Sequence, residues 1–267
     1  MNASGTGSPS VARNRLKTTL FDTREMIMPT HENNVLRDIT RLTQGKDAFG
    51  ILNAVYSLVS NDRIVLASSL SIEDQVITHM LCSLTKPRIF TLDTGRLFHE
   101  TYETMEETMK HYNFRYEIYA PDSHELEEMI AIHGPNLFYQ SMEFRKKCCA
   151  VRKTHPLRRV LSSADVWICG LRRDQAFTRA DVNPVEWDES NSIIKVNPLF
   201  DWSEERTRQF ISENNIPYNP LQNNGYRSIG CAPCTRPIKP EDDIRSGRWW
   251  WEEPEHKECG LHERRRG

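Results

Sequence analysis

Four of the seven cysteines form two close pairs. Cys231 and Cys234 are separated by two residues, a spacing that lets two thiolates converge on a metal and is a common half-site for zinc or iron–sulfur. The other two, Cys148 and Cys149, are adjacent. Because neighbouring side chains on a helix diverge by about 100°, both thiolates reach a single ion only with difficulty, whereas a four-iron cluster offers each its own iron. The pattern therefore favours 4Fe-4S over zinc.

Positive charge accompanies the adjacent pair. Residues 145–179 contain ten basic side chains against two acidic ones. Four thiolates on a cluster leave net negative charge, so this surplus favours ligation over the alternative that Cys148 and Cys149 are small buried hydrophobes. On a helix, Lys153 would project from the same side as Cys149. The basic run by itself is equally typical of a solvated helix face, and Cys82 and Cys169 lie in apolar segments that indicate core positions.

Cys259 stands in a cationic C-terminal sequence. His256, Lys257 and His262 surround it, and residues 264–266 are all arginines. Nearby cations lower the pKa of a thiol from about 8.5 and make the thiolate available as a nucleophile. This pattern indicates a reactive thiol that closes over a substrate held elsewhere. The other interpretation is an idle surface cysteine.

Apolar runs alternate with helical periodicity from residue 35 onward, as in a βαβ protein. Strands are expected at 63–67, 88–92, 115–119 and 166–170, and helices at 73–84, 99–112, 124–133 and 203–214. This order predicts an α/β fold, with a parallel sheet covered by helices on both faces and ligands at the carboxyl ends of the strands. The expected nucleotide site comprises Ser68, Ser69, Ser71, Leu92, Asp93, Gly170 and Arg172.

Three regions are expected along the chain. Residues 1–33 are polar and aperiodic, which predicts a flexible leader. Residues 34–225 form the α/β nucleotide-binding domain, and residues 226–267 form a C-terminal segment rich in Cys, Arg and Trp that carries the CxxC and Cys259.

Composition gives limited information about partners and compartment. The 35 Lys and Arg nearly balance the 37 Asp and Glu, so net charge says nothing about partners. No window approaches the about 18 apolar residues of a membrane span, and no secretory signal is present. Reduced thiols and a soluble cytoplasmic protein are expected. Residues 1–20, rich in Ser, Thr and Arg without acidic residues, also match an organellar transit peptide.

Six motifs along residues 64–262 together resemble assimilatory adenosine 5′-phosphosulfate (APS) reductase, a sulfonucleotide reductase. Each motif alone is weak, but six in the expected order are specific. They are the Cys148-Cys149 pair, Leu92-Asp-Thr-Gly-Arg96, Gly170-Leu-Arg-Arg-Asp-Gln175, Ser228-Ile-Gly-Cys-Ala-Pro-Cys-Thr-Arg236, Gly247-Arg-Trp-Trp-Trp251 and Lys257-Glu-Cys-Gly-Leu-His262.

The resemblance implies an activity and its site. APS would be reduced to sulfite and AMP through a thiosulfonate on Cys259. A 4Fe-4S cluster would be bound by Cys148, Cys149, Cys231 and Cys234, and the phosphosulfate by Lys153, Arg179, Arg245, Arg248 and His262. No second cysteine lies near Cys259 and no WCxxC module is appended, so the discharging thiol is expected from thioredoxin or glutaredoxin.

The family fold is similar to that of adenine-nucleotide α-hydrolases, whose phosphate loop reads SGGxDS. Residues 68–74 of this chain read SSLSIED and lack those glycines. Backbone without glycine cannot approach a triphosphate as closely, which disfavours an ATP-using adenylating enzyme. A loop of hydroxyls and amides can still hold one phosphosulfate.

Two other readings stay open at this point. Relatives acting on the 3′-phosphorylated substrate, PAPS, typically lack both cysteine pairs, so the resemblance favours APS. A zinc-stabilised nucleic-acid module would use the basic run but leaves the Cys259 motif unexplained, so no nucleic-acid partner is expected. The three tryptophans at 249–251 can stack adenine, form a partner surface or pack in the core. Homo-oligomerisation is not readable from the sequence.

Overall fold

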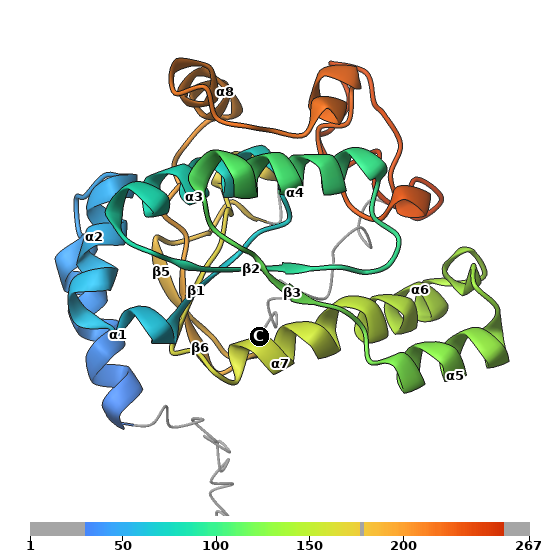
Figure 1. Ribbon diagram of the computed structural model, residues 1–267, viewed down its shortest axis with the longest axis horizontal. Coiled ribbons are helices and arrows are strands. Elements are labelled where there is room, and N and C mark those ends of the chain that lie inside the picture. The colour runs from blue at the N-terminus through green and yellow to red at the C-terminus, as the bar shows by residue number, and fades with distance from the viewer. Residues whose placement is uncertain (1–29, 177–178, 254–267) are drawn as a thin grey trace, which may run out of the picture.

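A six-stranded, mostly parallel sheet forms the centre of the computed structural model, which describes residues 30–176 and 179–253 (Figure 1). The strand order is β3-β2-β1-β4-β6-β5. The strands are β1 (Ile64–Ala67), β2 (Arg88–Leu92), β3 (Glu117–Tyr119), β4 (Val166–Ile168), β5 (Val185–Asp188) and β6 (Ile193–Val196). The chain runs outward from β1 through β2 to β3 and then crosses to β4 on the other side of β1. Strand order therefore reverses between β1 and β4, where ligands bind in open α/β sheets.

The expected parallel sheet is confirmed, with one difference at its edge. β5 pairs antiparallel with β6, and neither strand is expected from the sequence. Residues 185–188 contain two acidic residues, and β6 has a lysine at position 195, so neither reads as a continuous apolar run. Lys195 is nevertheless buried, with Glu186 at 3.9 Å and Asp188 at 3.7 Å.

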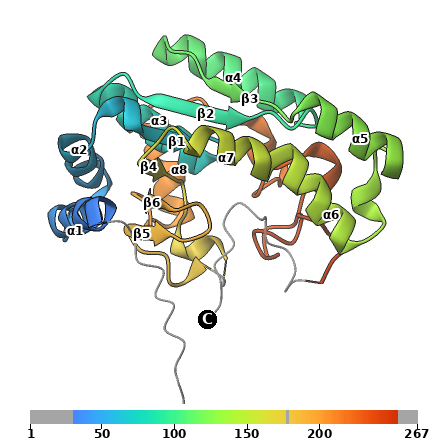
Figure 2. The same ribbon diagram turned by 90° about the horizontal axis from the view of Figure 1, so that it is seen from below.

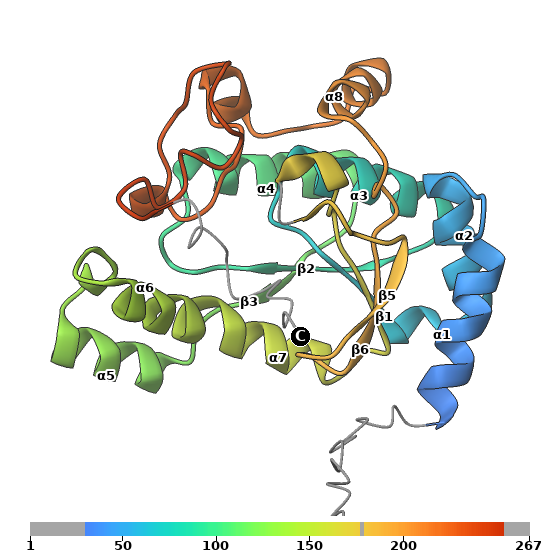
Figure 3. The same cartoon turned by 180° about the vertical axis from the view of Figure 1, so that it is seen from behind.

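Helices cover both faces of the sheet, as the views from below and behind show (Figures 2 and 3). One core packs α1 (Thr30–Thr43), α2 (Ala48–Leu58), α3 (Ile72–Leu84), α4 (His99–Tyr112) and α8 (Glu204–Glu213) against Ile64, Leu66 and Ile168. The opposite core packs α7 (His155–Leu161) against Val65 and Trp167. Successive strand residues thus point to opposite faces, as a pleated strand requires.

The adjacent cysteines end a helix that continues through a π-helical turn into a second helix. α6 (Met142–Cys149) ends at the pair, η3 (Ala150–Thr154) follows, and α7 continues without a break. On an α-helix, Lys153 is expected on the same side as Cys149. A π-helix has a wider turn, with hydrogen bonds from i to i+5, so that relation is altered. α5 (Ser123–His133) lies beside the continuous helical segment formed by α6, η3 and α7 in the views of Figures 1 and 2.

The C-terminal segment folds back over the carboxyl ends of the strands. Its turn η7 (Ala232–Cys234) is tied to the loop after β2, because the amide of Ala232 donates to the carbonyl of Arg96 at 2.8 Å. Thr235 and Arg248 form an isolated antiparallel bridge. The region without expected regular pattern is therefore held by backbone hydrogen bonds. Among the described residues, no helix is long and apolar enough to cross a membrane.

The expected leader boundary falls inside α1, which begins at Thr30. Residues 1–29 lie outside the described part of the chain, and so do 254–267, which include Cys259 and His262.

Candidate functional site

A cavity of about 220 Å³ opens at the carboxyl ends of β1, β2 and β4, where the strand order reverses. We name it the nucleotide cavity after the site expected there from the sequence. Its walls come from the loop after β1, the loop after β4, and the C-terminal segment. Ten of the expected substrate-binding residues line it: Ser68, Ser69, Ser71, Leu92, Lys153, Gly170, Arg172, Arg179, Arg245 and Arg248. The structure thus brings together residues that are up to 180 positions apart, from 68 to 248.

The loop after β1 is hydrogen-bonded to a carboxylate in the first turn of α3. Asp74, near the start of α3, accepts hydrogen bonds from the amide and the hydroxyl of Ser69, both at 2.7 Å. Burial raises the pKa of Asp74 to about 6, although the hydrogen bonds from Ser69 lower it. A carboxylate therefore occupies donors that a phosphate loop would direct at its ligand.

The loop after β4 contacts α3 closely. A Cβ at Gly170 would lie 2.4 Å from Asp74 Oδ1 and 2.8 Å from Glu73 Cβ, so only glycine fits. Arg172, which is 1% exposed, donates from Nε to Glu73 at 2.9 Å and from Nη1 to Asp174. The guanidinium of Arg172 is thus held by carboxylates, and it joins the loop after β4 to α3 in the wall of the cavity.

Asp93 does not line the cavity. Its Oδ1 accepts from the amide of Gly95 and the hydroxyl of Tyr102, both at 2.8 Å, and its own amide donates to the carbonyl of Tyr119 at 3.0 Å. These bonds shape the turn after β2. The side chain of Thr94, next to it, does line the cavity wall.

A second, smaller cavity is lined by all four paired cysteines. The other residues around it are Arg96, Phe138, Arg145, Arg152, Lys153, Pro233 and Trp249. Three of the cysteines are 7–8% exposed, and Cys149 is half-buried. In the described ranges, no three His, Cys, Asp or Glu side chains converge on one metal-ion position. The four cysteines line one space together.

Cations set the electrostatics of the cysteine cavity. Burial raises the pKa of Cys231, but Lys153, a contact with Thr94 Oγ1 at 3.3 Å, Arg248 and Arg152 outweigh it, and the net pKa is lowered. Burial and the neighbouring Cys231 raise the pKa of Cys234 to about 12. The surrounding cations therefore favour the thiolate form of Cys231.

Buried donors around the cysteines fit an anionic sulfur-rich group. Arg145 and Arg152 are 1% and 5% exposed, and Trp249 is 1% exposed. Within the described part of the chain, Arg152 Nε and Trp249 Nε1 have no hydrogen-bond partner. Buried polar groups left unpaired are rare and call for an explanation. A negatively charged cluster in this cavity would supply one, and the donor set of four thiols matches iron–sulfur ligation.

The burial of these cations bears on the basic run at 145–179. Arg145, Arg152 and Arg172 are each at most 5% exposed, so they are not a solvated helix face and cannot reach a nucleic-acid backbone. None of the three tryptophans at 249–251 lines the nucleotide cavity. Trp249 packs in the core with Cys148, Cys231 and Cys234.

The two cavities share a wall. Lys153 and Cys231 line both of them. Lys153 thus forms part of the wall of both cavities, and its charge lowers the pKa of Cys231.

Several lining residues are not among the expected site residues. Arg96 and Gln175 lie inside the motifs at 92–96 and 170–175, and Arg152 belongs to the basic run, so these three could have been found from the sequence. Glu204 and Arg227 line the nucleotide cavity but belong to no such motif. Cys259 and His262 lie outside the described residues, so their expected roles stay predictions.

The sheet order and the flanking helices are those of an adenine-nucleotide α-hydrolase-like fold, which two solved structures share. A phosphoadenylyl-sulfate reductase from Candida auris, in a phosphate complex, superposes with a TM-score of 0.65 at 24% identity, covering 79% of this chain and 98% of that one. An FMN adenylyltransferase from Candida glabrata superposes with a TM-score of 0.52 at 16% identity, with 85% of each chain covered. Both similarities concern the fold.

Sequence comparison identifies the family. The model of the phosphoadenosine phosphosulfate reductase domain matches residues 63–237. A protein from Allochromatium vinosum named adenosine 5′-phosphosulfate reductase is 50% identical over 204 residues, 76% of this chain and 80% of its own. The protein of the same name from Agrobacterium fabrum is 43% identical over 242 residues, 89% and 92% of the two chains. The chain belongs to the phosphoadenosine phosphosulfate reductase family.

Proposed function

We propose that this protein reduces adenosine 5′-phosphosulfate to sulfite and AMP, using a cysteine thiosulfonate and an external thiol, as in assimilatory sulfate reduction. The observation that carries the proposal is the shared wall: Lys153 and Cys231 line both the nucleotide cavity and the four-cysteine cavity. The relatives named for this activity, at 43–50% identity, support the choice of substrate.

The first step is attack by a thiolate on a doubly charged substrate. Cys259 forms a bond to the sulfur of the sulfo group, the bond from that sulfur to the phosphate oxygen breaks, and AMP leaves. An anion approaching an anion needs fixed positive charge around the developing negative charge. Lys153, Arg245 and Arg248 line the cavity and provide it, with His262 as a further expected contact.

The second step returns Cys259 to a thiolate. One thiolate of thioredoxin or glutaredoxin attacks the sulfur of Cys259 and expels sulfite, and the second thiol resolves the mixed disulfide. The dithiol supplies both electrons and becomes a disulfide. The substrate sulfur is reduced, and no net oxidation of this chain occurs.

A 4Fe-4S cluster held by Cys148, Cys149, Cys231 and Cys234 is part of the proposal. When bound, it would supply structural and electrostatic support at the wall of the nucleotide cavity, since the thiols already provide both electrons. Lys153 and Arg152 would then have an anionic partner beside them.

Mass measurement of a thiol-free reaction tests the proposed nucleophile. Mixed anaerobically with APS, the protein should release one AMP per active site and gain a sulfo group on the peptide containing Cys259. Adding thioredoxin should then release sulfite. Cys259→Ser should keep the visible spectrum and lose turnover. A sulfo group on another cysteine, or undiminished turnover by Cys259→Ser, would refute the assignment.

Metal analysis tests the proposed ligands separately. Cys149→Ser should lose iron and the broad visible absorption, whereas Cys82→Ser, outside the cavity, should keep both. Full iron retention in Cys149→Ser, or stoichiometric zinc in the wild type, would reject the cluster.

The 3′-phosphorylated substrate is the remaining candidate, because the family model is named for it. Steady-state assays with APS and PAPS at equal concentration distinguish the two. Equal or greater efficiency with PAPS would overturn the substrate and leave the mechanism standing.

A further inference from the structure

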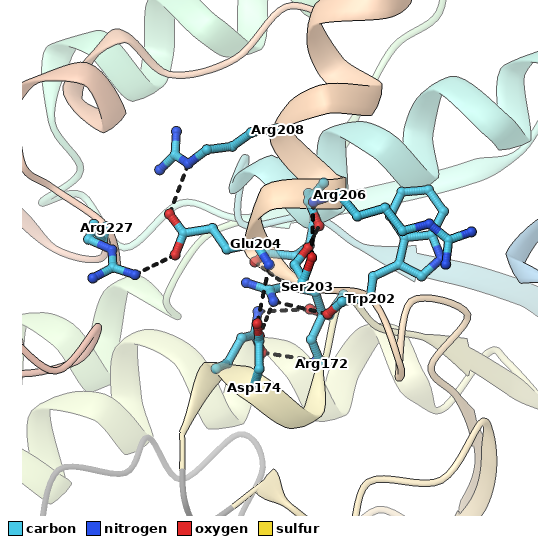
Figure 4. A network of polar contacts seen from close by, with 12 residues as sticks. Arg172, Asp174, Trp202, Ser203, Glu204, Arg206, Arg208 and Arg227 are labelled. Carbon is cyan, nitrogen blue, oxygen red and sulfur yellow. Dashed lines mark hydrogen bonds and ion pairs between the residues drawn. The ribbon is translucent and has the colours of Figure 1, made fainter. Parts of the chain in front are cut away.

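A chain of polar contacts, made of ion pairs and one hydrogen bond from a backbone amide, leads from the loop after β4 past α8 to Arg227 in the C-terminal segment (Figure 4). It begins at the buried pair of Glu73 and Arg172 and continues to Asp174. Asp174 Oδ2 then accepts from the amide of Glu204, at the start of α8, at 3.2 Å. The last link is the pair between Glu204 Oε2 and Arg227 Nη2 at 2.6 Å. Glu204 and Arg227 both line the nucleotide cavity.

Arg227 also contacts the loop that precedes two expected phosphosulfate contacts. Its Nη1 donates to the carbonyl of Pro240 at 3.3 Å and to that of Asp242 at 3.4 Å. The chain then turns at Asp243, whose Oδ1 accepts from the amide of Arg245 at 2.8 Å. One guanidinium thus joins the carboxylate of α8 to the backbone that leads directly into Arg245.

We propose that Arg227, held by Glu204, is a positioning residue that fixes the loop at 240–248 over the nucleotide cavity, so that Arg245 and Arg248 meet an anionic group of the substrate. The proposal rests on the proposed function for the identity of that group. No motif named above includes either Arg227 or Glu204.

The geometry favours positioning over a purely electrostatic effect. Glu204 is 18% exposed and Arg227 25% exposed, so the pair is partly shielded from water. Arg227 uses Nη2 for Glu204 and Nη1 for the two carbonyls, which fixes the plane of the guanidinium. A planar guanidinium with several donors holds these groups in a fixed relative position better than a single flexible ammonium would.

Glu204→Gln separates the two roles because they predict opposite signs. If Glu204 acted only through its charge, removing a carboxylate from the wall of this cavity would tighten the binding of an anion. If it positions Arg227, the loop loses its anchor and binding weakens. We expect Glu204→Gln and Arg227→Gln each to raise the Kd for APS about three- to tenfold. The double variant should show no loss beyond that of Arg227→Gln, since Glu204 acts through Arg227.

The binding experiment uses the full-length protein carrying Cys259→Ser, with calorimetric titration of APS and of adenosine. Adenosine lacks the phosphosulfate, so its Kd should stay unchanged in all three variants. Arg208→Gln is the matched control. Arg208 also pairs with Glu204, at 2.8 Å, but it does not line the cavity, and the Kd for APS should be unaffected.

Each contrary result has a definite meaning. Tighter or unchanged APS binding by Glu204→Gln overturns the positioning role. Additive effects of the two substitutions would show that Arg227 acts independently of Glu204, which also overturns it. An equal loss for adenosine would mean that the pair supports only the fold of the cavity. If the parent protein fails to bind APS at all, the proposed function fails instead, and the variants are not at fault.

Discussion

Lys153 lines both cavities. It lowers the pKa of Cys231 and lines the nucleotide cavity as well. Lys153→Met should weaken APS binding by about 1.5–3 kcal/mol, the range for a hydrogen bond to a charged group, and should also alter the visible spectrum of a bound cluster. Titration of APS and absorption spectroscopy on the same samples measure the two effects.

Lys146→Met is the control for Lys153, because Lys146 is exposed on α6 and lines neither cavity. Unchanged APS affinity in Lys153→Met would remove Lys153 from the substrate site.

Asp74 makes stability depend on pH in an unusual direction. Burial raises its pKa from 3.8 to about 6, so the folded protein holds this proton more tightly than the unfolded chain. The free energy of unfolding therefore falls as pH rises from about 4 to about 6 and stays reduced above that. Asp74→Asn removes the titration. Its free energy of unfolding, measured relative to that of the wild type, should therefore rise by about 1–3 kcal/mol from pH 4 to pH 7.

Urea unfolding of both proteins at pH 4.5 and pH 7.5 measures that gain, and Glu253→Gln, at an exposed position, provides the reference. A constant difference between Asp74→Asn and the wild type at both pH values would show that Asp74 does not titrate in this window.

At the scale of secondary structure, the loop after β4 approaches α3 so closely that only glycine fits at position 170. A methyl group at position 170 would overlap Asp74 and Glu73. Gly170→Ala should therefore destabilise the protein by about 1–3 kcal/mol, the usual range for overpacking. It should also weaken adenosine binding, because the loops after β1 and β4 must separate. Thermal unfolding and adenosine titration check both effects, and a wild-type affinity for adenosine would contradict them.

The elements that could be predicted are those with an uninterrupted pattern. β1 and β2 are apolar runs, and α3 and α4 show helical periodicity, so their positions follow from sequence within a few residues. β6 is not predicted because Lys195 interrupts its apolar pattern. The buried side chain of Lys195 is paired with Glu186 and Asp188 of β5. Those two partners are brought to it by strand pairing, which local sequence does not reveal.

The candidate site shows the same division. Cysteine spacing and nearby charge are local, and ten expected substrate residues do line one cavity. Asp93 was expected there, yet its carboxylate is used by Gly95 and Tyr102. The pair of Glu204 and Arg227 could not be predicted, because the two residues meet only when the C-terminal segment folds back over the sheet.

At the scale of the whole molecule, a buried ion pair fastens the end of the described chain to the cysteine-bearing helix. Arg145 Nη2 and Glu252 Oε2 lie 2.7 Å apart at 1% and 8% exposure, and Arg145 also stacks on Trp249, with its guanidinium carbon 4.5 Å from the ring centroid. Removing one partner leaves a buried charge, so Glu252→Ala should cost about 3–5 kcal/mol of unfolding free energy.

Chemical unfolding and iron content measure that loss, because α6 carries two expected ligands. Glu253→Ala changes the neighbouring, exposed carboxylate and should have almost no effect. If both alanine variants were equally stable, the pair would not hold the segment to α6.

The hydrogen bond between η7 and the loop after β2 can form only late in synthesis, because η7 is translated long after that loop. Cys148 and Cys149 leave the ribosome long before Cys231 and Cys234, and the amide of Ala232 finds its acceptor only on a loop that follows a formed strand. A growing chain therefore displays its first two thiols to the surrounding solution while the second two are still untranslated. Until Cys231 and Cys234 have been made and the C-terminal segment has folded back, the cavity that the four cysteines line cannot form.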